Sequence, residues 1–203
     1  MRAAEEVHGL EALDGRPVEA AGRTDMAIAR SLLRAAGVSD EQIDQRAEAV
    51  ADRAVELFAE LCPPDLSSKV APGIPDLLSA LAGRPGEFRL SLVTGNLEPI
   101  ARLKLGRAGI GSFFEPGQGG FGSDHVSRAR LPAIARGRAS DPPWPRDRTA
   151  VIGDTPRDIA CARADQVRVA AVGTGPFTVE QLADADAVAD DAHALLPVLE
   201  DWL

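Results

Sequence analysis

The stretch AVIGDTPRDIACAR, residues 150–163, indicates the fold class of this protein. Its first part is an apolar run of strand length, and Gly153 breaks that run. Thr155 and Pro156 are typical of a helix start, because threonine can cap a helix and proline fits the first helical turn. The stretch therefore predicts a strand that turns directly into a helix, with Asp154 at the tip of the strand.

The same alternation of strand and helix recurs on both sides of this stretch. FRLSLVTG (88–95) and VRVAAVGTG (167–175) have the composition of strands that end in a glycine turn. Helical patterns occupy residues 75–81, 96–109 and 128–139. Strands that alternate with helices form parallel sheets covered on both faces. The sequence therefore predicts the α/β class, with a Rossmann-like parallel sheet as its core.

The amino-terminal part of the chain has a different pattern. Apolar residues recur at helical spacing over residues 26–62, with an interruption after which Ser39 or Asp40 caps the second helix. A proline-rich segment follows, and such a segment is typical of a linker. We therefore expect a helical domain over residues 1–70 and an α/β domain over residues 71–203.

The composition restricts the possible partners and the location. Thirty-one acidic against 22 basic residues give the chain of 203 residues a net charge of −9. Nucleic acids and anionic membranes are therefore disfavoured as partners, because both repel an acidic surface. Cys62 and Cys161 are far apart in the sequence and indicate neither a disulfide framework nor a zinc site. No apolar run reaches the roughly 18 residues of a membrane span, so we expect a cytoplasmic protein.

Two carboxylates follow the strand at residues 150–153. Asp154 and Asp158 are four residues apart, so they share one face of the helix and can point at one spot. Two close carboxylates repel each other unless a proton or a cation lies between them, and Mg²⁺ favours such hard oxygen ligands. The pair therefore predicts a Mg²⁺ site, although Asp154 could also serve as a helix-capping residue without any metal.

A second strand end carries small polar residues. Thr94 offers a hydroxyl, Gly95 allows a close approach of the backbone, and the following helix start presents free N–H groups to an anion. In parallel α/β sheets, ligands bind at the carboxyl ends of the strands, so this turn and Asp154 should face the same crevice. The alternative is an ordinary connection between a strand and a helix.

Four segments carry a resemblance to a known family. They are VAPGIPDLLSAL (70–81), LVTGN (92–96), FGSDHVSRARL (121–131) and VIGDTPRDIACARA (151–164). In this order they resemble the haloacid dehalogenase superfamily of phosphatases, close to its phosphoglycolate-phosphatase-like branch. AAGRTDMAIARSLL (20–33) is similar to the start of that branch's helical cap. The resemblance implies a Mg²⁺-dependent reaction in which a phosphoryl group passes to an aspartate and water then releases it.

The resemblance also implies roles for individual residues. Thr94, Gly95 and Asn96 would hold the transferring phosphoryl oxygens, which is the electrostatic work that phosphoryl transfer chiefly needs. Asp154 would bind Mg²⁺ directly, and Asp158 would bind it directly or through water. These are expectations carried over from the family motifs.

Members of the family use a cation, normally lysine, to balance the phosphate and the nucleophile. Arg128 occupies the usual place in the sequence, and Lys104 competes with it from the helix after Thr94. Both stay open as candidates, with a solvent-facing role as the alternative for each. In the cap, Arg23 could reach a substrate carboxylate, and Asp25 is expected to cap a helix that begins at Met26.

One element that the resemblance implies is missing. The family has a nucleophilic aspartate in a D-x-D-G-T turn after a first strand, whereas ALDGRP (12–17) has one carboxylate, Asp14, and no apolar strand before it. We therefore do not assign Asp14 as the nucleophile. In the family the first strand lies between the strands at 90–95 and 149–154, so these two should stand about 10 Å apart, twice the normal spacing. Their unpaired edges would lower stability unless another segment fills the gap.

Three explanations of the missing element stay open. The first is a start assigned too far downstream or a shortened form of a longer protein, and the second is a truncated gene product without catalysis. The third is a sheet repaired by pairing across the gap or by a strand from another chain. The sequence predicts a phosphatase of a small phosphorylated metabolite in its complete form, and no turnover by the polypeptide as given. The alternative is a non-catalytic or regulatory protein that keeps the phosphate and metal pocket. A different nucleotide-binding domain is disfavoured, because GQGGFG (117–122) opens no immediate helix.

Overall fold

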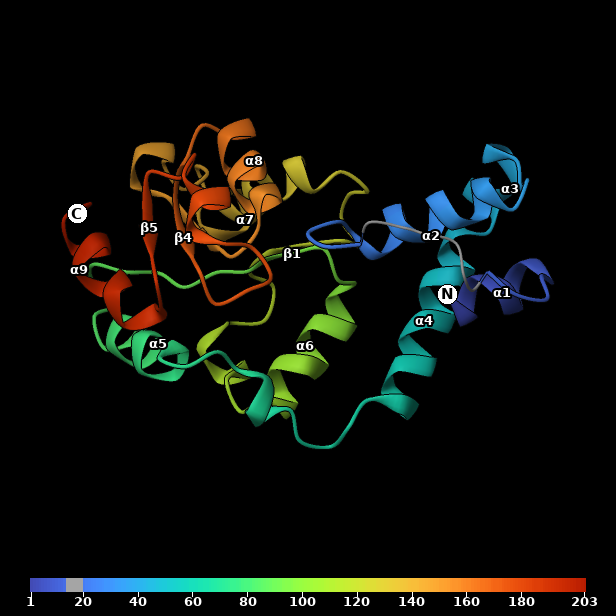
Figure 1. The fold of residues 1–203 in the computed structure, drawn as a ribbon, viewed down its shortest axis with the longest axis horizontal. Coiled ribbons are helices and arrows are strands. Elements are labelled where there is room, and N and C mark those ends of the chain that lie inside the picture. Colours follow the sequence, from blue (N-terminus) through green and yellow to red (C-terminus); the bar gives the residue numbers. More distant parts are fainter. Residues whose placement is uncertain (14–19) are drawn as a thin grey trace.

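The computed structural model describes residues 1–13 and 20–203, which form two lobes (Figure 1). The helices are α1 (Arg2–His8), α2 (Asp25–Ala35), α3 (Asp40–Gln45), α4 (Ala47–Leu61), α5 (Ile74–Ala82), α6 (Glu98–Arg107), α7 (Leu131–Ala139), α8 (Pro156–Ala164) and α9 (Leu195–Glu200). The strands are β1 (Val93–Thr94), β2 (Gly120–Phe121), β3 (Ala150–Gly153), β4 (Arg168–Val172) and β5 (Ala187–Ala189). Across the described residues, no helix has the length and apolar character to cross a membrane.

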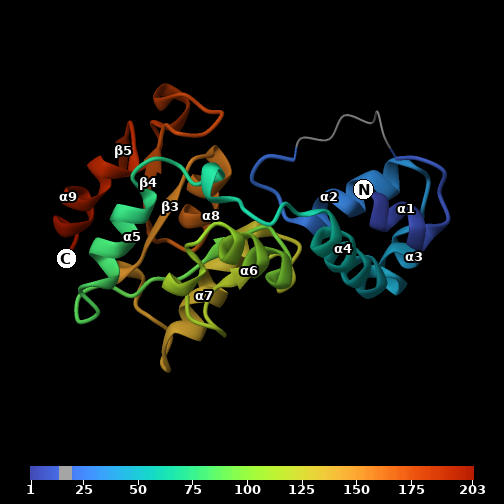
Figure 2. The same cartoon turned by 90° about the horizontal axis from the view of Figure 1, so that it is seen from below.

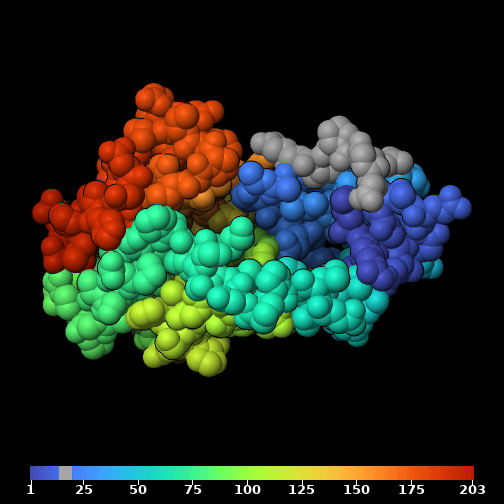
Figure 3. All heavy atoms as spheres, turned by 60° about the horizontal axis from the view of Figure 1, so that its bottom comes forward, coloured from blue at the N-terminus to red at the C-terminus, as the bar shows by residue number. Residues whose placement is uncertain are grey.

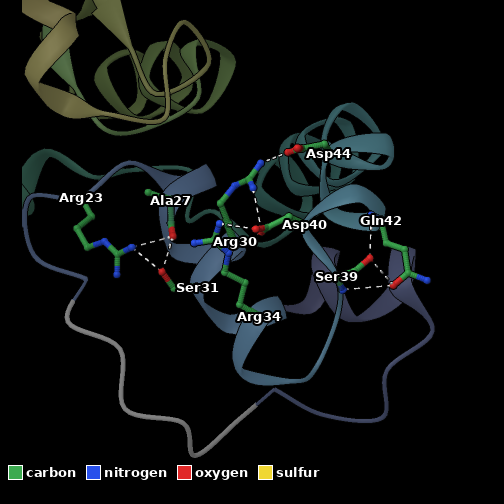
Figure 4. A network of polar contacts seen from close by, with 9 residues as sticks. All are labelled: Arg23, Ala27, Arg30, Ser31, Arg34, Ser39, Asp40, Gln42 and Asp44. Carbon is green, nitrogen blue, oxygen red and sulfur yellow. Dashed lines mark hydrogen bonds and ion pairs between the residues drawn. The ribbon is translucent and has the colours of Figure 1, made fainter.

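The first lobe is a bundle of α1 to α4 with its own apolar core. Thr24 caps α2, because its hydroxyl accepts a hydrogen bond from the Ala27 N–H at 3.1 Å. Ser39 caps α3 and forms a reciprocal capping box with Gln42 (Figure 4). The buried core residues of this lobe are Ala4, Leu13, Leu32, Leu33, Ile43 and Val50.

The prediction that Asp25 caps a helix beginning at Met26 is wrong. α2 begins at Asp25 itself, and its cap is Thr24, whose backbone is extended with φ −79° and ψ 149°. A capping side chain must come from such a non-helical residue, because only there does its oxygen reach the free N–H groups of the first turn. The Asp25 carboxylate is therefore left to contact the second lobe.

The second lobe contains parallel strands in two separate sheets. β1 pairs with β2, and β3, β4 and β5 follow one another in the second sheet. The predicted α/β class with parallel strands is thus confirmed. Among the described residues, β1 pairs only with β2 and β3 pairs only with β4. The expectation that these two strands keep unpaired inner edges is also confirmed.

The strand expected at residues 88–95 is much shorter in the structure. β1 covers only Val93–Thr94, and its ladder to β2 begins where the Leu92 carbonyl accepts the Gly120 N–H at 2.8 Å. A strand exists only where its backbone groups find a partner, and residues 88–91 have none on a neighbouring strand in the described part of the chain. The hydrophobic pattern alone does not reveal where pairing stops.

Helices cover both faces of the three-stranded sheet, as Figure 2 shows around β4. Val169 and Ala171 of β4 are buried against α8, whereas Ala170 and Val172 are buried against α5 and α9. Alternate residues of a strand point to opposite faces, so β4 is apolar throughout because neither of its faces meets solvent.

The turn after β2 depends on the carboxylate of Asp124. Arg138 of α7 donates two hydrogen bonds to it, at 2.6 and 2.7 Å, and the Phe121 N–H donates a third at 2.8 Å. Burial alone would raise the pKa of the Asp124 carboxyl, but these hydrogen bonds outweigh it and hold the pKa below its ordinary value.

The lowered pKa predicts a pH-dependent contribution of Asp124 to stability. The carboxylate stabilises the fold above the ordinary carboxyl pKa of about 3.9, and this contribution is lost as the pH falls through the lowered pKa. We expect Asp124→Asn to lower the free energy of unfolding at about pH 6, and the difference to shrink as the pH falls below the ordinary carboxyl pKa. Urea unfolding across this range measures it, with Asp52→Asn on the exposed surface of α4 as the control. An equal difference at both pH values would contradict the prediction.

Candidate active site

The carboxyl ends of β1 and β3 lie at the same edge of the second lobe, beneath residues 22–24 of the first. A side chain on Gly22 would come within 2.7 Å of the Arg157 side chain, and one on Gly95 would overlap the Arg23 carbonyl. Residues 22–24 therefore cross the turn after each strand. The space-filling view in Figure 3 shows the two lobes in contact.

Asp158 is buried at the first turn of α8, where both of its oxygens are engaged. One oxygen accepts hydrogen bonds from the Thr155 hydroxyl at 2.8 Å, the Thr155 N–H at 3.0 Å and the Asp154 N–H at 3.2 Å. The other is paired with Arg128. Thr155 is the N-cap of α8, as its place in the sequence predicted. Asp158 thus holds the turn in shape, and a metal ion bound directly to it would share or displace the contact with Arg128.

Asp154 lies at the tip of β3 and keeps its carboxylate available. No other residue of the described chain donates a hydrogen bond to its oxygens. Burial and then the negative charge of Asp158 raise the pKa of Asp154 above its ordinary value, and Arg128 offsets part of this effect. A side chain on Gly175 would overlap the carboxylate, so a glycine is needed beside it.

Of the two candidate cations, Arg128 is the one that contacts these carboxylates. It lies in the short helix Arg128–Arg130 ahead of α7, and it forms an ion pair with Asp158. Its Nε is buried and has no hydrogen-bond acceptor among the described residues. The guanidinium is therefore held at this edge by its ion pair with Asp158, and its Nε is not exposed to a ligand.

Lys104 and Asn96 lie together on the β1 side. Lys104 Nζ donates to the Asn96 side-chain oxygen at 2.8 Å, and the ammonium lies 5.2 Å from the centre of the Phe58 ring in α4. The Asn96 N–H donates to the Thr94 hydroxyl at 3.2 Å, which closes the turn after β1. The two candidate cations thus contact different halves of the edge, Lys104 the Thr94 turn and Arg128 the carboxylates.

Asp25 joins the first lobe to this turn. Its carboxylate accepts the Asn96 side-chain amide at 3.1 and 3.2 Å and the Leu97 N–H at 3.0 Å. Its own N–H donates to the Gly95 carbonyl at 2.8 Å, and the Thr24 hydroxyl donates to the Val126 carbonyl at 2.7 Å. We call these contacts of Thr24 and Asp25 the lobe latch. The sequence pattern does not reveal it, because only the three-dimensional structure brings residue 25 to residue 96.

The lobe latch predicts that removing the Asp25 carboxylate lowers the free energy of unfolding. Asp25→Ala deletes the acceptor for Asn96 and Leu97, and hydrogen bonds to a charged group contribute about 1.5–3 kcal/mol. We expect a loss of about 2 kcal/mol in urea unfolding and faster amide exchange at Leu97. The exposed Asp52→Ala is the matched control, with an expected change within about 0.5 kcal/mol. Equal changes in both variants would show that the lobe latch adds no stability.

Arg23 does not extend toward the second lobe in this structure. Its guanidinium donates to the Ala27 carbonyl at 2.9 Å and to the Ser31 hydroxyl at 2.6 Å, both on α2 (Figure 4). A substrate role for Arg23 stays a prediction, and it would require these bonds to open. Asp14 and the other residues of 14–19 lie outside the described residues.

The metal-ligand set at this edge has two carboxylates. Within residues 1–13 and 20–203, no group of three or more His, Cys, Asp or Glu side chains is placed to hold a metal ion. Mg²⁺ in proteins is usually held by one or two carboxylates together with water and substrate phosphate oxygens. Asp154 therefore fits as a direct ligand, and Asp158, which is already bonded to Thr155 and Arg128, fits better as a residue that orients bound water.

Solved structures and a family model relate the chain to known proteins. The structure is similar to β-phosphoglucomutase from Clostridium difficile, with a TM-score of 0.65 and 19% identity over 99% of this chain and 86% of that one. It is also similar to CbbY from Rhodobacter sphaeroides in complex with phosphate, with a TM-score of 0.64 and 22% identity over 98% of this chain and 90% of that one. At these identities the likeness shows a common fold.

A mutant of the same CbbY in complex with xylulose-(1,5)bisphosphate has a TM-score of 0.63 and 22% identity over 96% of this chain and 88% of that one. A search of the curated proteins found no match. The family model for haloacid dehalogenase-like hydrolases matches residues 3–163, which is well over half of the chain. The chain therefore belongs to the haloacid dehalogenase-like hydrolase family.

Proposed function

We propose that this edge binds the phosphate group of a small phosphorylated metabolite, of phosphoglycolate size, together with Mg²⁺, as the site of a phosphatase. The observation that supports this most is the carboxylate of Asp154, which has no hydrogen-bond donor from another described residue and lies beside the Arg128–Asp158 ion pair. An unpaired, partly buried carboxylate beside a second one is stabilised by a cation. In this proposal residues 1–70 form the cap domain and residues 71–203 form the core domain.

In this proposal Asp154 binds Mg²⁺ directly, and Asp158 acts through water because both of its oxygens already accept hydrogen bonds. When bound, Mg²⁺ would neutralise charge on the phosphate oxygens. Gly153 and Gly175 leave room for the two carboxylates, since a side chain on either would overlap one of them.

The phosphate oxygens are assigned to the turn after β1 and to Arg128. Thr94 and Gly95 bring a hydroxyl and a close-lying backbone to the edge. The start of α6 adds less than its sequence suggests, because the Leu97 N–H donates to Asp25, the Glu98 N–H donates to the Ser123 hydroxyl, and Pro99 has no N–H. Arg128 is the better candidate for the cation, because its ion pair with Asp158 places its charge beside Asp154, whereas Lys104 is bonded to Asn96. Lys104 and Asn96 would then shape the turn, with Asp25 as their partner in the cap.

The substrate class rests on charge and on the comparisons. An acidic chain needs a local cation and a metal to attract a phosphate ester, and the edge supplies Arg128 and the Mg²⁺ ligands. Two solved structures of the fold hold phosphate or a sugar bisphosphate. We propose the same chemical class here, a phosphate monoester of a small metabolite.

The proposal is tested by phosphate binding measured by calorimetry with and without Mg²⁺. We expect Mg²⁺-dependent binding, and we expect Asp154→Asn to weaken it at least tenfold, which is about 1.4 kcal/mol. Asp201→Asn, an exposed carboxylate near the carboxyl end of the chain, is the matched control and should bind as the unchanged protein does. Equal affinity of all three proteins would contradict a metal role for Asp154.

Turnover is a separate question, because the sequence contains no D-x-D-G-T turn of the kind that carries the nucleophile in the family. We expect the chain as given to bind phosphate with Mg²⁺ and to release no phosphate from generic phosphate esters. Release well above background that Asp154→Ala abolishes would overturn this expectation. Binding without turnover would instead favour the alternative, a phosphate- and metal-binding protein without catalysis.

A further inference from the structure

The turn after β1 is held by one residue from each lobe. The Asn96 side chain lies between Lys104 Nζ, which donates to its oxygen at 2.8 Å, and the Asp25 carboxylate, which accepts its amide nitrogen at 3.1 and 3.2 Å. A lysine only donates and a carboxylate only accepts, so the amide satisfies both in one orientation and neither in the flipped one. Asp25 and Lys104 together therefore fix the Asn96 side chain.

Asp25 also fixes the peptide unit between Gly95 and Asn96. Its N–H donates to the Gly95 carbonyl at 2.8 Å, and the Asn96 N–H of that same peptide unit donates to the Thr94 hydroxyl oxygen at 3.2 Å. A peptide unit is planar, so a bond that sets the direction of its C=O also sets the direction of its N–H. The Asp25 carboxylate holds the next N–H, that of Leu97, at 3.0 Å. The first lobe thus sets the direction from which the Thr94 hydroxyl receives its hydrogen bond.

The Thr94 hydroxyl keeps its hydrogen for a ligand. A hydroxyl has one hydrogen to donate and two lone pairs that accept, and the Asn96 N–H occupies one lone pair. Over residues 1–13 and 20–203, no acceptor takes the hydrogen. The bonded N–H directs this hydrogen away from Asn96, where it is available to a phosphate oxygen, which only accepts hydrogen bonds.

The charge of Asp25 makes its role testable by the sign of the effect. A carboxylate beside the turn repels a phosphate dianion, because both are negative. Removing the carboxylate also leaves the Lys104 ammonium without the negative charge that Asn96 links to it. On charge alone, a variant without the carboxylate would therefore bind phosphate more tightly. Loss of position has the opposite effect, because a turn that moves freely must be ordered again when phosphate binds.

We infer that Asp25 is a positioning residue for phosphate binding. From the first lobe it fixes the peptide unit between Gly95 and Asn96 and thereby orients the Thr94 hydroxyl toward a phosphate oxygen. The inference rests on the proposed function, since phosphate is the ligand of this turn in both. It goes further, because it makes the affinity of the turn for phosphate depend on the seating of the first lobe. By linkage, bound phosphate strengthens the contact between Asp25 and Asn96 to the same degree.

Two variants at position 25 remove the contacts in steps. Asp25→Ala removes the carboxylate and keeps the N–H, whereas Asp25→Pro removes both. The position accepts proline because it is the first residue of α2, where the N–H has no partner within the helix. The preceding residue, Thr24, has the extended backbone that a residue before proline requires, with φ −79° and ψ 149°.

Calorimetry with inorganic phosphate and Mg²⁺ measures the effect, at a temperature at which all of the proteins are folded. We expect the Kd for phosphate to rise about tenfold in Asp25→Ala and further in Asp25→Pro. Ser39→Ala removes the cap of α3, elsewhere in the first lobe, and controls for loss of stability, so it should bind phosphate as the unchanged protein does. An unchanged or lower Kd in Asp25→Ala would overturn the inference and leave the proposed function intact.

A second measurement needs no ligand. Amide exchange at Asn96, whose N–H is bonded to Thr94 and not to Asp25, should become several-fold faster in Asp25→Ala, because its protection depends on the held peptide unit. Faster exchange at Leu97 alone, whose N–H loses its own acceptor, would show a local contact without positioning and would also overturn the inference. Absence of phosphate binding by the unchanged protein would overturn the proposed function and the inference together, so the two failures are distinguishable.

Discussion

Asp165→Ala is expected to lower the free energy of unfolding by about 3–5 kcal/mol, the usual cost of breaking a buried ion pair. Arg136 of α7 donates to both oxygens of Asp165, at 2.7 and 2.9 Å, and both side chains are buried. Arg136 also donates to the Trp144 carbonyl at 2.6 Å, and Arg146 to the Asp165 carbonyl at 2.7 Å. Removing the carboxylate leaves a buried guanidinium without its partner.

Two further variants make this prediction specific. Glu56→Ala removes the exposed partner of Arg53 and should cost under about 1 kcal/mol in the same urea unfolding measurement. The double change of Arg136→Met with Asp165→Leu removes both charges, and we expect it to be much less harmful than Asp165→Ala alone. If Asp165→Ala costs no more than Glu56→Ala, the pair does not anchor the end of α8 to α7.

Gly122→Ala is expected to cost about 3 kcal/mol, the upper part of the range for forcing extra atoms into a packed site. A side chain at this position would overlap the Gly95 carbonyl and approach the Asn96 carbonyl at 3.2 Å. The Gly122 N–H also donates to the Asn96 carbonyl at 2.8 Å. The added methyl group would therefore push on the backbone of the turn after β1, which the proposed function assigns to phosphate.

Gly137→Ala is the matched control for this change. Gly137 lies inside α7 with nothing within 4 Å of an added side chain, so we expect alanine to stabilise the helix by up to about 1 kcal/mol. Urea unfolding measures both effects, and phosphate binding with Mg²⁺ should weaken only in Gly122→Ala. A Gly122→Ala protein as stable as Gly137→Ala would show that the turn yields easily to the methyl group.

Local sequence signals predicted the elements whose causes are local. The apolar run before Gly153 forms β3, and Thr155 with Pro156 begins α8, because capping and proline geometry act within one helical turn. β2 and β5 were not predicted, since strands of two and three residues carry almost no pattern of their own. They exist because neighbouring strands offer them backbone partners.

The candidate site likewise has features that the sequence predicts and features that only the structure shows. The family motifs brought out Thr94, Asp154, Asp158 and Arg128, and their residue types point to phosphate and Mg²⁺ before any coordinates are known. The structure then separates their roles, because the oxygens of Asp158 are taken up by Thr155 and Arg128 while those of Asp154 stay available. Hydrogen-bond partners from distant elements cannot be inferred from spacing along a helix.

Sequence by itself determined the α/β class, the helical first lobe and the placing of polar residues at two strand ends, because periodicity, capping and turn chemistry are properties of neighbouring residues. Only the tertiary structure decided that Asp25 holds Asn96, that Arg128 meets Asp158, and that a cavity opens between β1 and β3. These features arise where segments far apart in the chain compete for the same hydrogen bonds and the same space, and that competition is settled only when the whole chain is folded.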